Sequence, residues 1–475
     1  MNISVPNLLR AALLAAVLLS PAPEAQPKEP APKLVVPKDG MRLTCDTLLA
    51  PGTYYLEKGI EIAADGVTLD GGGAVLIGRD FTGSAVRASG RKKITIRNLD
   101  AERYYHGIRL ENCQDVAVEN NKITRTAEAE FGRQFVNVWA AAKEAYGAGI
   151  ILIGVRGGRI SANDLQHQQN GISMYSCSGL TVERNNASYE SGWGIHLYDS
   201  SDNIIQDNVA DFCNRIQFRR WGDHVGADSA GLLMVHNSCR NKVLRNLFRC
   251  SGDGVFVAGY HGEKAPCSGN LFEENDCSLS PNNAFESTFC EGNIFRKNKA
   301  NSSNYGFWLG YSWKNEVSEN EIANNRLAGV AIEHGNTNVI SKNTIRGNRH
   351  GIMLWTRGGG DFVADFPELQ DSHSYTITGN RIEANRIGIN SITGKPREVH
   401  CRNYTIIGNR ITDNRIGIRF ERTTDCRIDG NTMSGNAVEN VRLIESPGNT
   451  VANNAAAEPP KEDPDITSLP WDVRR

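Results

Sequence analysis

The chain lacks an excess of charge of either sign. Its 475 residues include 52 Lys and Arg against 54 Asp and Glu, for a net charge of -2 and an isoelectric point of about 6.6. A strongly basic surface is what draws a protein to nucleic acid or to an anionic membrane. We therefore expect neither nucleic acid nor a membrane as a partner, and we expect a monomer.

Long apolar runs and zinc-ligand patterns are also missing. The apolar run at residues 11–19 is too short to span a bilayer as a helix, and it follows Arg10. Residues 1–25 therefore have the pattern of a secretory signal peptide, which predicts a secreted or periplasmic protein. No grouping of Cys and His has the spacing of zinc ligands, so we predict no metal site.

Two further segments stand apart from the rest of the chain. Residues 26–39 are rich in proline and are predicted to be a flexible linker. Residues 456–475 are polar, contain proline and are predicted to be a C-terminal tail. Residues 40–455 remain as one long domain.

A short repeated phrase fills that domain. It reads Gly-apolar-x-apolar-x, as in residues 329–333 and 351–355, followed by Asn-x-apolar-x-x-Asn, as in residues 343–348. Neighbouring copies lie 22 or 23 residues apart where nothing is inserted, as from Asn298 to Asn320 and from Asn320 to Asn343. A fixed period with short alternating strands and no helix is typical of a solenoid.

The alternation indicates which side chains face inward. An apolar residue at every second position predicts a strand with one buried face. The recurring Asn is predicted to be structural, because side-chain amides stacked at a turn hydrogen-bond along the axis. Four of the eleven cysteines, Cys177, Cys239, Cys267 and Cys290, share one position in their coils, which favours a buried row of thiols over disulfides.

On these phrases the chain resembles the right-handed parallel β-helix proteins of the pectate-lyase-like superfamily. Residues 51–55 and 67–73 also look like the first coil of many such proteins. The resemblance implies an all-β fold, a single right-handed parallel β-helix of about 12–14 coils. It also implies polysaccharide chemistry, although a fold does not determine a function. The Asp-Pro-His-Asp box of alginate epimerases is absent, which argues against that branch.

Insertions predict where a site would lie. Residues 127–146 and 209–229 interrupt the repeat before the Gly-apolar strand, and residues 259–268, 357–373 and 393–402 interrupt it after that strand. Loops on both sides of one strand stack would make a trough with the Gly-apolar strands as its floor, and concavities built by loops commonly carry function.

Outward positions of the floor are rich in acids, histidines and aromatic residues. Paired carboxylates among aromatic residues favour glycoside hydrolysis, whereas a lyase acting on a uronate needs Ca²⁺ or positive charge, for which Arg215, Arg219 and Arg220 are available. A non-catalytic carbohydrate-binding or periplasmic scaffold protein is the third alternative. We expect no cofactor, with Ca²⁺ only in the lyase case. The catalytic candidates are Glu286, Glu333, Asp253 and His334, and the candidates for stacking on or binding a polysaccharide or oligosaccharide are Trp308, Trp355, Tyr305, Tyr198, His196, Trp193, Phe256 and His350.

Overall fold

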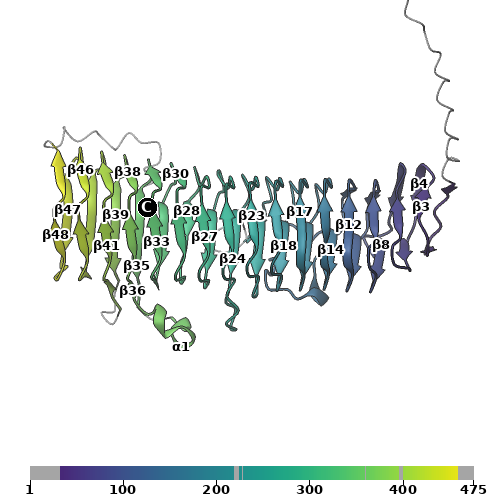
Figure 1. Cartoon of the computed structure of the whole chain (residues 1–475), viewed down its shortest axis with the longest axis horizontal. Helices are drawn as coiled ribbons and strands as arrows, with labels where there is room; N and C mark the ends of the chain where they lie inside the picture. Colours follow the sequence, from purple (N-terminus) through teal and green to yellow (C-terminus); the bar gives the residue numbers. More distant parts are fainter. Residues whose placement is uncertain (1–32, 219–223, 227, 359, 395–398, 458–475) are drawn as a thin grey trace, which may run out of the picture. The chain divides into compact units, whose positions relative to one another are not determined.

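The strands stack coil upon coil along one axis (Figure 1). The computed structural model describes residues 33–218, 224–226, 228–358, 360–394 and 399–457. The predicted signal peptide, most of the linker, Arg219, Arg220 and nearly all of the tail lie outside these residues. Within them the chain is a parallel β-helix, as expected, because each short strand can bury its apolar face only against its own neighbouring coils.

The Gly-apolar strands form a parallel sheet of sixteen strands, here called the floor sheet. In order, its strands are β2 (Arg42–Leu43), β5 (Ile60–Ile62), β8 (Ser84–Ser89), β11 (His106–Glu111), β14 (Ala148–Ile153), β16 (Asn170–Tyr175), β18 (Trp193–Tyr198), β22 (Ala230–Val235), β24 (Asp253–Ala258), β26 (Asn283–Thr288), β28 (Tyr305–Trp308), β31 (Ala328–Glu333), β35 (His350–Thr356), β39 (Ile387–Thr393), β43 (Ile416–Glu421) and β47 (Glu439–Ile444).

A second parallel sheet of seventeen strands lies across the core from the floor sheet. Its strands are β1 (Leu34–Val35), β3 (Thr47–Leu49), β6 (Thr68–Asp70), β9 (Thr95–Arg97), β12 (Gln114–Glu119), β15 (Arg156–Ser161), β17 (Ser178–Glu183), β19 (Ile204–Gln206), β23 (Lys242–Leu244), β25 (Leu271–Glu273), β27 (Ile294–Arg296), β29 (Glu316–Ser318), β33 (Val339–Ser341), β37 (Thr376–Thr378), β41 (Thr405–Ile407), β45 (Arg427–Asp429) and β48 (Thr450–Ala452).

Shorter sheets complete the coils. Two of them contain β4 (Gly52–Tyr55), β7 (Ala74–Ile77), β10 (Asp100–Glu102) and β13 (Lys122–Thr124), and then β30 (Glu321–Ala323), β34 (Thr344–Arg346), β38 (Arg381–Glu383), β42 (Arg410–Thr412), β46 (Thr432–Ser434) and β49 (Ala455–Ala457). The remaining strands are β20 (Ile216–Gln217), β21 (His224–Val225), β32 (Gly335–Asn336), β36 (Ser372–His373), β40 (Cys401–Arg402) and β44 (Thr423–Thr424).

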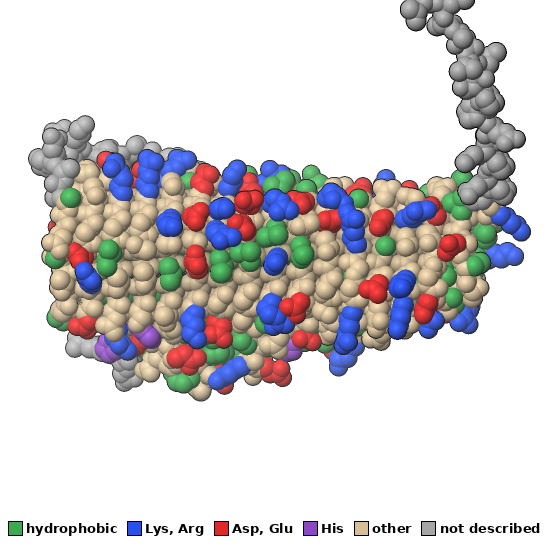
Figure 2. Space-filling view, viewed as in Figure 1, with side chains coloured by type: hydrophobic (Ala, Val, Ile, Leu, Met, Phe, Trp, Pro, Cys, Tyr) green, Lys and Arg blue, Asp and Glu red, His purple; other side chains and the backbone are tan. Residues whose placement is uncertain are grey.

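The described part of the chain has little helix. It consists of α1 (Phe362–Asp365), η1 (Ala142–Glu144) and η2 (Pro367–Leu369), and no helix among the described residues is long and apolar enough to cross a bilayer. On the face shown in Figure 2, acidic and basic side chains are interspersed along the stack.

The sequence-based boundaries need two corrections. The floor sheet has sixteen strands, more than the 12–14 coils expected, because the first coils form short strands that lack the Gly-apolar phrase. The fold also begins inside the segment predicted as linker, since β1 pairs in parallel with β3, Leu34 opposite Leu48.

The inward residues of the floor sheet are buried as the alternation predicts. Ile352 and Leu354 are both fully buried, and one continuous apolar core runs through the stack. The eleven cysteines are all free, and Cys177, Cys267 and Cys290 are buried in this core. These residues therefore behave as small core side chains.

The recurring asparagines form hydrogen-bonded ladders at the turns. The Nδ2 group of Asn320 donates to Oδ1 of Asn343 at 2.9 Å, and Nδ2 of Asn343 donates to Oδ1 of Asn380 at 3.0 Å. Each of these amides also donates to a backbone carbonyl of the preceding coil, as Asn343 does to Val317 at 2.8 Å. The ladder therefore satisfies backbone groups where the strands bend away from sheet pairing.

Candidate functional site

Part of the expected trough is covered. The insertion 127–146, here called the roof loop, lies on the floor strands β18, β22 and β24, where Val136 and Val138 join one buried cluster with Leu233 and Phe256. From the other side of the floor, His261 stacks on Trp139 of the roof loop, with ring centroids 5.2 Å apart. The outward aromatic residues of these strands therefore form the surface on which the roof loop packs.

Three residues that were predicted to bind a ligand are buried under this cover: Trp193, His196 and Phe256. Trp193 is 0% exposed and its indole N–H donates to the carbonyl of Asp228 at 2.9 Å. Neither ring nitrogen of His196 has a hydrogen-bond partner among the described residues, and burial lowers the pKa of His196 to about 3. These side chains are packing groups and cannot meet a ligand from solvent.

Arg215 is a structural residue as well. It is 1% exposed, and its guanidinium donates to the carbonyls of Glu130 at 2.5 Å, Gln134 at 3.1 Å and Ser191 at 3.4 Å. It thus joins the roof loop to the insertion 209–229. Its charge is committed to backbone carbonyls, which removes it from the positive groups considered for a lyase.

Glu333 and His334 support the loop that follows β35. Glu333 is 3% exposed and forms an ion pair with the guanidinium of Arg357. The Nδ1–H group of His334 donates to the carbonyls of Leu369 and Gln370 at 2.9 and 3.0 Å, and its Nε2 accepts from the backbone N–H of Arg357 at 3.2 Å. Both predicted catalytic residues are therefore buried and have structural partners, and their part in catalysis stays a prediction.

The floor is open beyond the roof loop. Tyr305, Trp308 and Trp355 are half-exposed there. The ring of Trp308 lies 5.1 Å from that of Tyr305 and 5.4 Å from that of Trp355. Trp308 pairs in register with Ala331, whose small side chain leaves room for the two tryptophans to lean together. These three rings form one accessible apolar surface, here called the aromatic platform.

A group of carboxyls lies where the cover ends and the platform begins. Asp253 starts β24, and its Oδ1 accepts from the backbone N–H of Asn283 and from Nδ2 of Asn282, both at 2.9 Å. The side chain of Asn283 donates in turn to Oε2 of Glu286 at 2.6 Å. Asn283 therefore links two carboxyl groups on neighbouring coils.

Both carboxyls hold their protons more tightly than usual. Burial, together with the nearby carboxylate of Asp228, raises the pKa of Asp253 to about 7. Burial and the charges of Asp253 and Asp228 raise the pKa of Glu286 well above its ordinary value. Asp253 is only 1% exposed, whereas Glu286 is half-exposed and pairs in register with Trp308. Glu286 is therefore the member of this group that a ligand can reach.

The register separates Glu286 from Glu333. Glu286 aligns with Trp308 and then Ala331, so Glu333 lies two coils away and two residues further along its strand. At ~4.8 Å per coil and ~3.3 Å per residue, their Cα atoms are about 12 Å apart. The carboxyl groups of inverting glycosidases are only ~6.5–9.5 Å apart, which argues against this predicted pair.

Two further predicted binding residues are half-exposed. Tyr198 stacks on His236 with ring centroids 4.6 Å apart, beside the roof loop. His350 begins β35, and burial together with the charges of Arg349, Arg386 and Arg419 lowers its pKa to about 4. Their part in binding stays a prediction.

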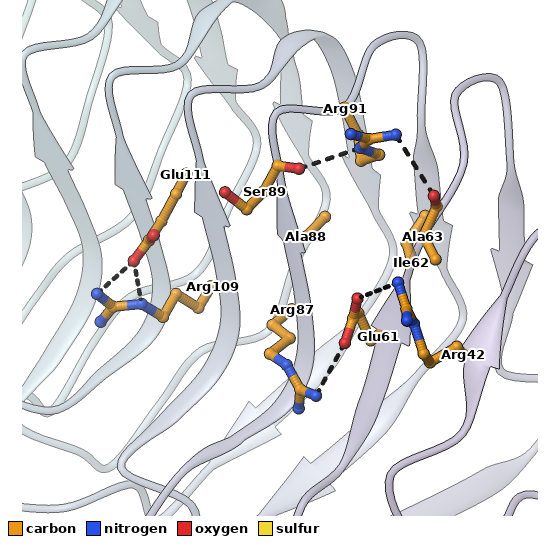
Figure 3. A pocket seen from close by; sticks show the side chains of 10 residues that line it. All are labelled: Arg42, Glu61, Ile62, Ala63, Arg87, Ala88, Ser89, Arg91, Arg109 and Glu111. Carbon is orange, nitrogen blue, oxygen red and sulfur yellow. Dashed lines mark hydrogen bonds and ion pairs between the residues drawn. The ribbon is translucent and has the colours of Figure 1, made fainter.

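The N-terminal end of the floor sheet carries a shallow depression of about 400 Å³ (Figure 3). Its arginines are largely paired: Arg42 and Arg87 share Glu61 at 3.2 and 3.1 Å, and Arg109 pairs with Glu111. Its charges are thus mostly compensated within the depression.

Sequence reasoning missed Asn283 and Asp228. Asn283 sits at the start of a floor strand where the repeat tolerates any residue, and Asp228 belongs to an insertion without periodicity. Across the described ranges, no three His, Cys, Asp or Glu side chains are grouped so that they could hold a metal ion.

No curated protein sequence matches this chain. Solved structures that align with it include the A-module of mannuronan C-5 epimerase AlgE6 from Azotobacter vinelandii, with 15% identity, 88% of this chain and 91% of that chain covered and a TM-score of 0.37. A mutant of the periplasmic alginate epimerase AlgG aligns with 13% identity, coverage of 76% and 79% and a TM-score of 0.45. The catalytic domain of a GH87 α-1,3-glucanase in complex with tetrasaccharides aligns with 11% identity, coverage of 86% and 64% and a TM-score of 0.35. These TM-scores are too low for the alignments to bear on the chemistry of this chain.

Family models match more directly. The model of the right-handed β-helix region matches residues 142–284, from the end of the roof loop into β26. The model described as periplasmic copper-binding protein (NosD) matches residues 222–365 and 368–461, just over half of the chain. The chain therefore belongs to the NosD family of right-handed parallel β-helix proteins.

Proposed function

We propose that this protein is exported, binds a polysaccharide or oligosaccharide along the open part of the floor sheet and cleaves it by glycoside hydrolysis. The observation that carries the proposal is Glu286, a half-exposed carboxyl with a raised pKa, directly beside Trp308 on the next coil. A carboxyl with a raised pKa is suited to giving a proton to a leaving oxygen.

The other carboxyls would assist Glu286. Asp253 lies behind it, too buried to touch a substrate, and once Asp253 is ionised its charge makes Glu286 harder to deprotonate. Asp228 affects the pKa of both groups and is half-exposed, so we assign it the role of the ionised partner. As Glu286 gives its proton to the glycosidic oxygen, the carboxylate of Asp228 would accept a proton from the attacking water, as in an inverting glycosidase.

The aromatic platform would hold the sugar rings. Aromatic faces offer flat apolar surfaces, and Trp308 and Trp355 are half-exposed without the cover that buries Trp193. Their tilt of 59° to each other would suit two successive sugars of a twisted chain more than one flat ring. The roof loop would end the binding surface on the N-terminal side.

Copper binding, which the family description names, finds no support in the residues described. Copper sites need soft or imidazole ligands in a converging set. The nearest approach to one is the row of Cys267 and Cys290, and burial raises the pKa of the Cys267 thiol well above its ordinary value. A thiol must lose its proton to bind a metal, so these two cysteines do not fit a copper site.

A non-catalytic role is the second candidate, and the burial of three of the four predicted catalytic residues, Asp253, Glu333 and His334, favours it. In that case the aromatic platform would hold a glycan that the protein does not cleave. For a lyase, Arg215 is not available as a positive group, because its guanidinium is bonded to backbone carbonyls.

Incubation with a panel of plant, algal and bacterial glycans separates these candidates. Release of reducing ends without the absorbance of an unsaturated uronate supports hydrolysis, and a rise in that absorbance supports a lyase. Binding without products supports the non-catalytic role. Cell fractionation with and without residues 1–25 tests export, since only the full chain should leave the cytoplasm.

A further inference from the structure

Four arginines follow the recurring Asn on successive coils: Arg326, Arg349, Arg386 and Arg415, here called the arginine row. Their backbones are in direct register. The N–H of Arg386 donates to the carbonyl of Asn348, which precedes Arg349, and the N–H of Arg415 donates to the carbonyl of Asn385, which precedes Arg386, both at 3.1 Å. The row therefore places like charges next to one another at about 4.8 Å per coil.

The charges of the row are not compensated. Many other arginines pair with acids on the neighbouring coil, as Arg245 does with Asp207 at 2.8 Å and Arg296 with Glu273 at 3.0 Å. No member of the row forms an ion pair with a described residue; the one side-chain bond it makes joins Arg326 to the carbonyl of Pro281 at 2.9 Å. Like charges opposite each other in a sheet are unfavourable, so the row costs stability unless an anion lies on it.

The row borders the aromatic platform. Arg349 immediately precedes His350, the first residue of β35, and Arg326 precedes β31 by two positions. The charge of Arg349 acts to lower the pKa of both Tyr305 and His350, and Arg386 acts in the same direction on His350. The guanidinium groups are thus close enough to the floor for one extended ligand to reach both surfaces.

We propose that the arginine row binds the acidic groups of an acidic polysaccharide whose sugar rings lie on the aromatic platform. Guanidinium groups bind carboxylate and sulfate through two parallel hydrogen bonds, and successive coils repeat that donor pair along the axis. The substrate would thus be an acidic polysaccharide. This inference rests on the proposed function, which places the sugar rings on the aromatic platform. The depression at the other end of the floor sheet is a weaker anion site, because Glu61 and Glu111 already occupy its arginines.

The test compares two double variants of the full chain. Arg349→Gln with Arg386→Gln removes two charges from the row. Arg156→Gln with Arg410→Gln removes two charges from exposed arginines on β15 and β42, outside the floor sheet, which also lack ion pairs with described residues. Calorimetry measures the affinity for polygalacturonate, for dextran sulfate and for uncharged dextran, each at low and at high salt.

We expect the row variant to bind both polyanions about tenfold or more weakly than the control variant, with a smaller dependence on salt. Weakening for polygalacturonate alone or for dextran sulfate alone assigns the row to carboxylates or to sulfates. Equal loss in both variants, or no binding of either polyanion by the unmodified protein, overturns the inference.

A third variant, Trp308→Ala with Trp355→Ala, separates this inference from the proposed function. If it loses glycan binding while the row variant keeps it, the platform stands and the row inference fails. If polyanion binding depends on the row and not on the tryptophans, and no glycan is cleaved, the row remains a polyanion site and the proposed function fails.

Discussion

Asn283 donates a 2.6 Å hydrogen bond to the carboxyl of Glu286. The backbone N–H of the same residue donates to Asp253, so one residue sets the position of a half-exposed acid and of the buried acid behind it. A short hydrogen bond from a neutral amide holds Glu286 in place while leaving its second oxygen free to exchange a proton.

Replacing Glu286 by Gln should lower turnover by at least about a hundredfold while folding and glycan binding persist, because the amide keeps the shape but carries no titrating proton. Steady-state rates on the best glycan of the panel measure the effect. Glu333→Gln is the matched control. Since Glu333 is buried and pairs with Arg357, this variant should lose stability and keep its turnover. If Glu333→Gln lost turnover and Glu286→Gln kept it, Glu333 and not Glu286 would be the catalytic residue.

The stability of the protein should fall as the pH rises from about 4 to about 7, in part through Asp253. The folded state keeps the Asp253 proton up to a pKa of about 7, whereas the unfolded chain loses it near the ordinary value of 3.8. A carboxyl with a raised pKa in the folded state stabilises that state only at low pH. The contribution of Asp253 is on the order of 4 kcal/mol at most.

Asp253→Asn keeps the acceptor oxygen for Asn282 and Asn283 and removes the titration. Urea unfolding at several pH values should therefore give a flatter stability profile for this variant, with its largest gain over the unmodified protein above about pH 7. Parallel profiles for the two proteins would show that the folded pKa of Asp253 is not raised.

Ala in place of Trp308 or Trp355 should weaken glycan binding and leave the thermal midpoint nearly unchanged, since both rings are half-exposed. Trp193→Ala is the opposite case. It empties a fully buried position under the roof loop and should cost about 3–5 kcal/mol. Thermal unfolding and calorimetry on the three variants check both statements, and a large stability loss for Trp308→Ala would make that residue a packing group.

Leu in place of Asn343 should destabilise the fold by roughly 3 kcal/mol and leave the chemistry of the site untouched. The change removes the bonds to Asn320, Asn380 and the carbonyl of Val317, and leaves buried groups without partners. Unfolding measurements and rates at a permissive temperature check it. Full stability with lost activity would contradict a structural role for the ladder.

Met in place of Arg215 should release the roof loop from the insertion 209–229, because several backbone carbonyls lose their donor. Limited proteolysis should then cut within residues 127–146 at least several times faster, with the coils intact. Equal cutting rates in both proteins would show that packing alone holds the loop.

The fold followed from the sequence because one physical rule governs it. Alternation of apolar residues decides which side of a short strand is buried. Ile352 and Leu354 follow that rule, since both are fully buried. The aromatic platform followed for the same reason, since Trp308 and Trp355 occupy outward positions of the same strands.

The rest of the site could not be predicted from the sequence, because an outward apolar side chain can either bind a ligand or pack under a loop. Trp193 and Phe256 point outward like Trp308, yet they support the roof loop, whose sequence has no period that would reveal where it lies. Glu333 likewise has a partner, Arg357, in an insertion. The arginine row was visible in the printed sequence as Asn-Arg at four coils in succession, but its meaning depends on the absence of acidic neighbours among the described residues.

The ladder through Asn343 also has a direction, because its side-chain amides all donate the same way along the stack. From Asn121 to Asn454, each side-chain amide donates toward the next coil and accepts from the previous one, with no reversal. Every amide dipole therefore points the same way, and each bond polarises the next. The solenoid thus has an electrical direction that a sheet of paired strands lacks, with the positive end of every ladder amide turned toward the C-terminal end of the stack.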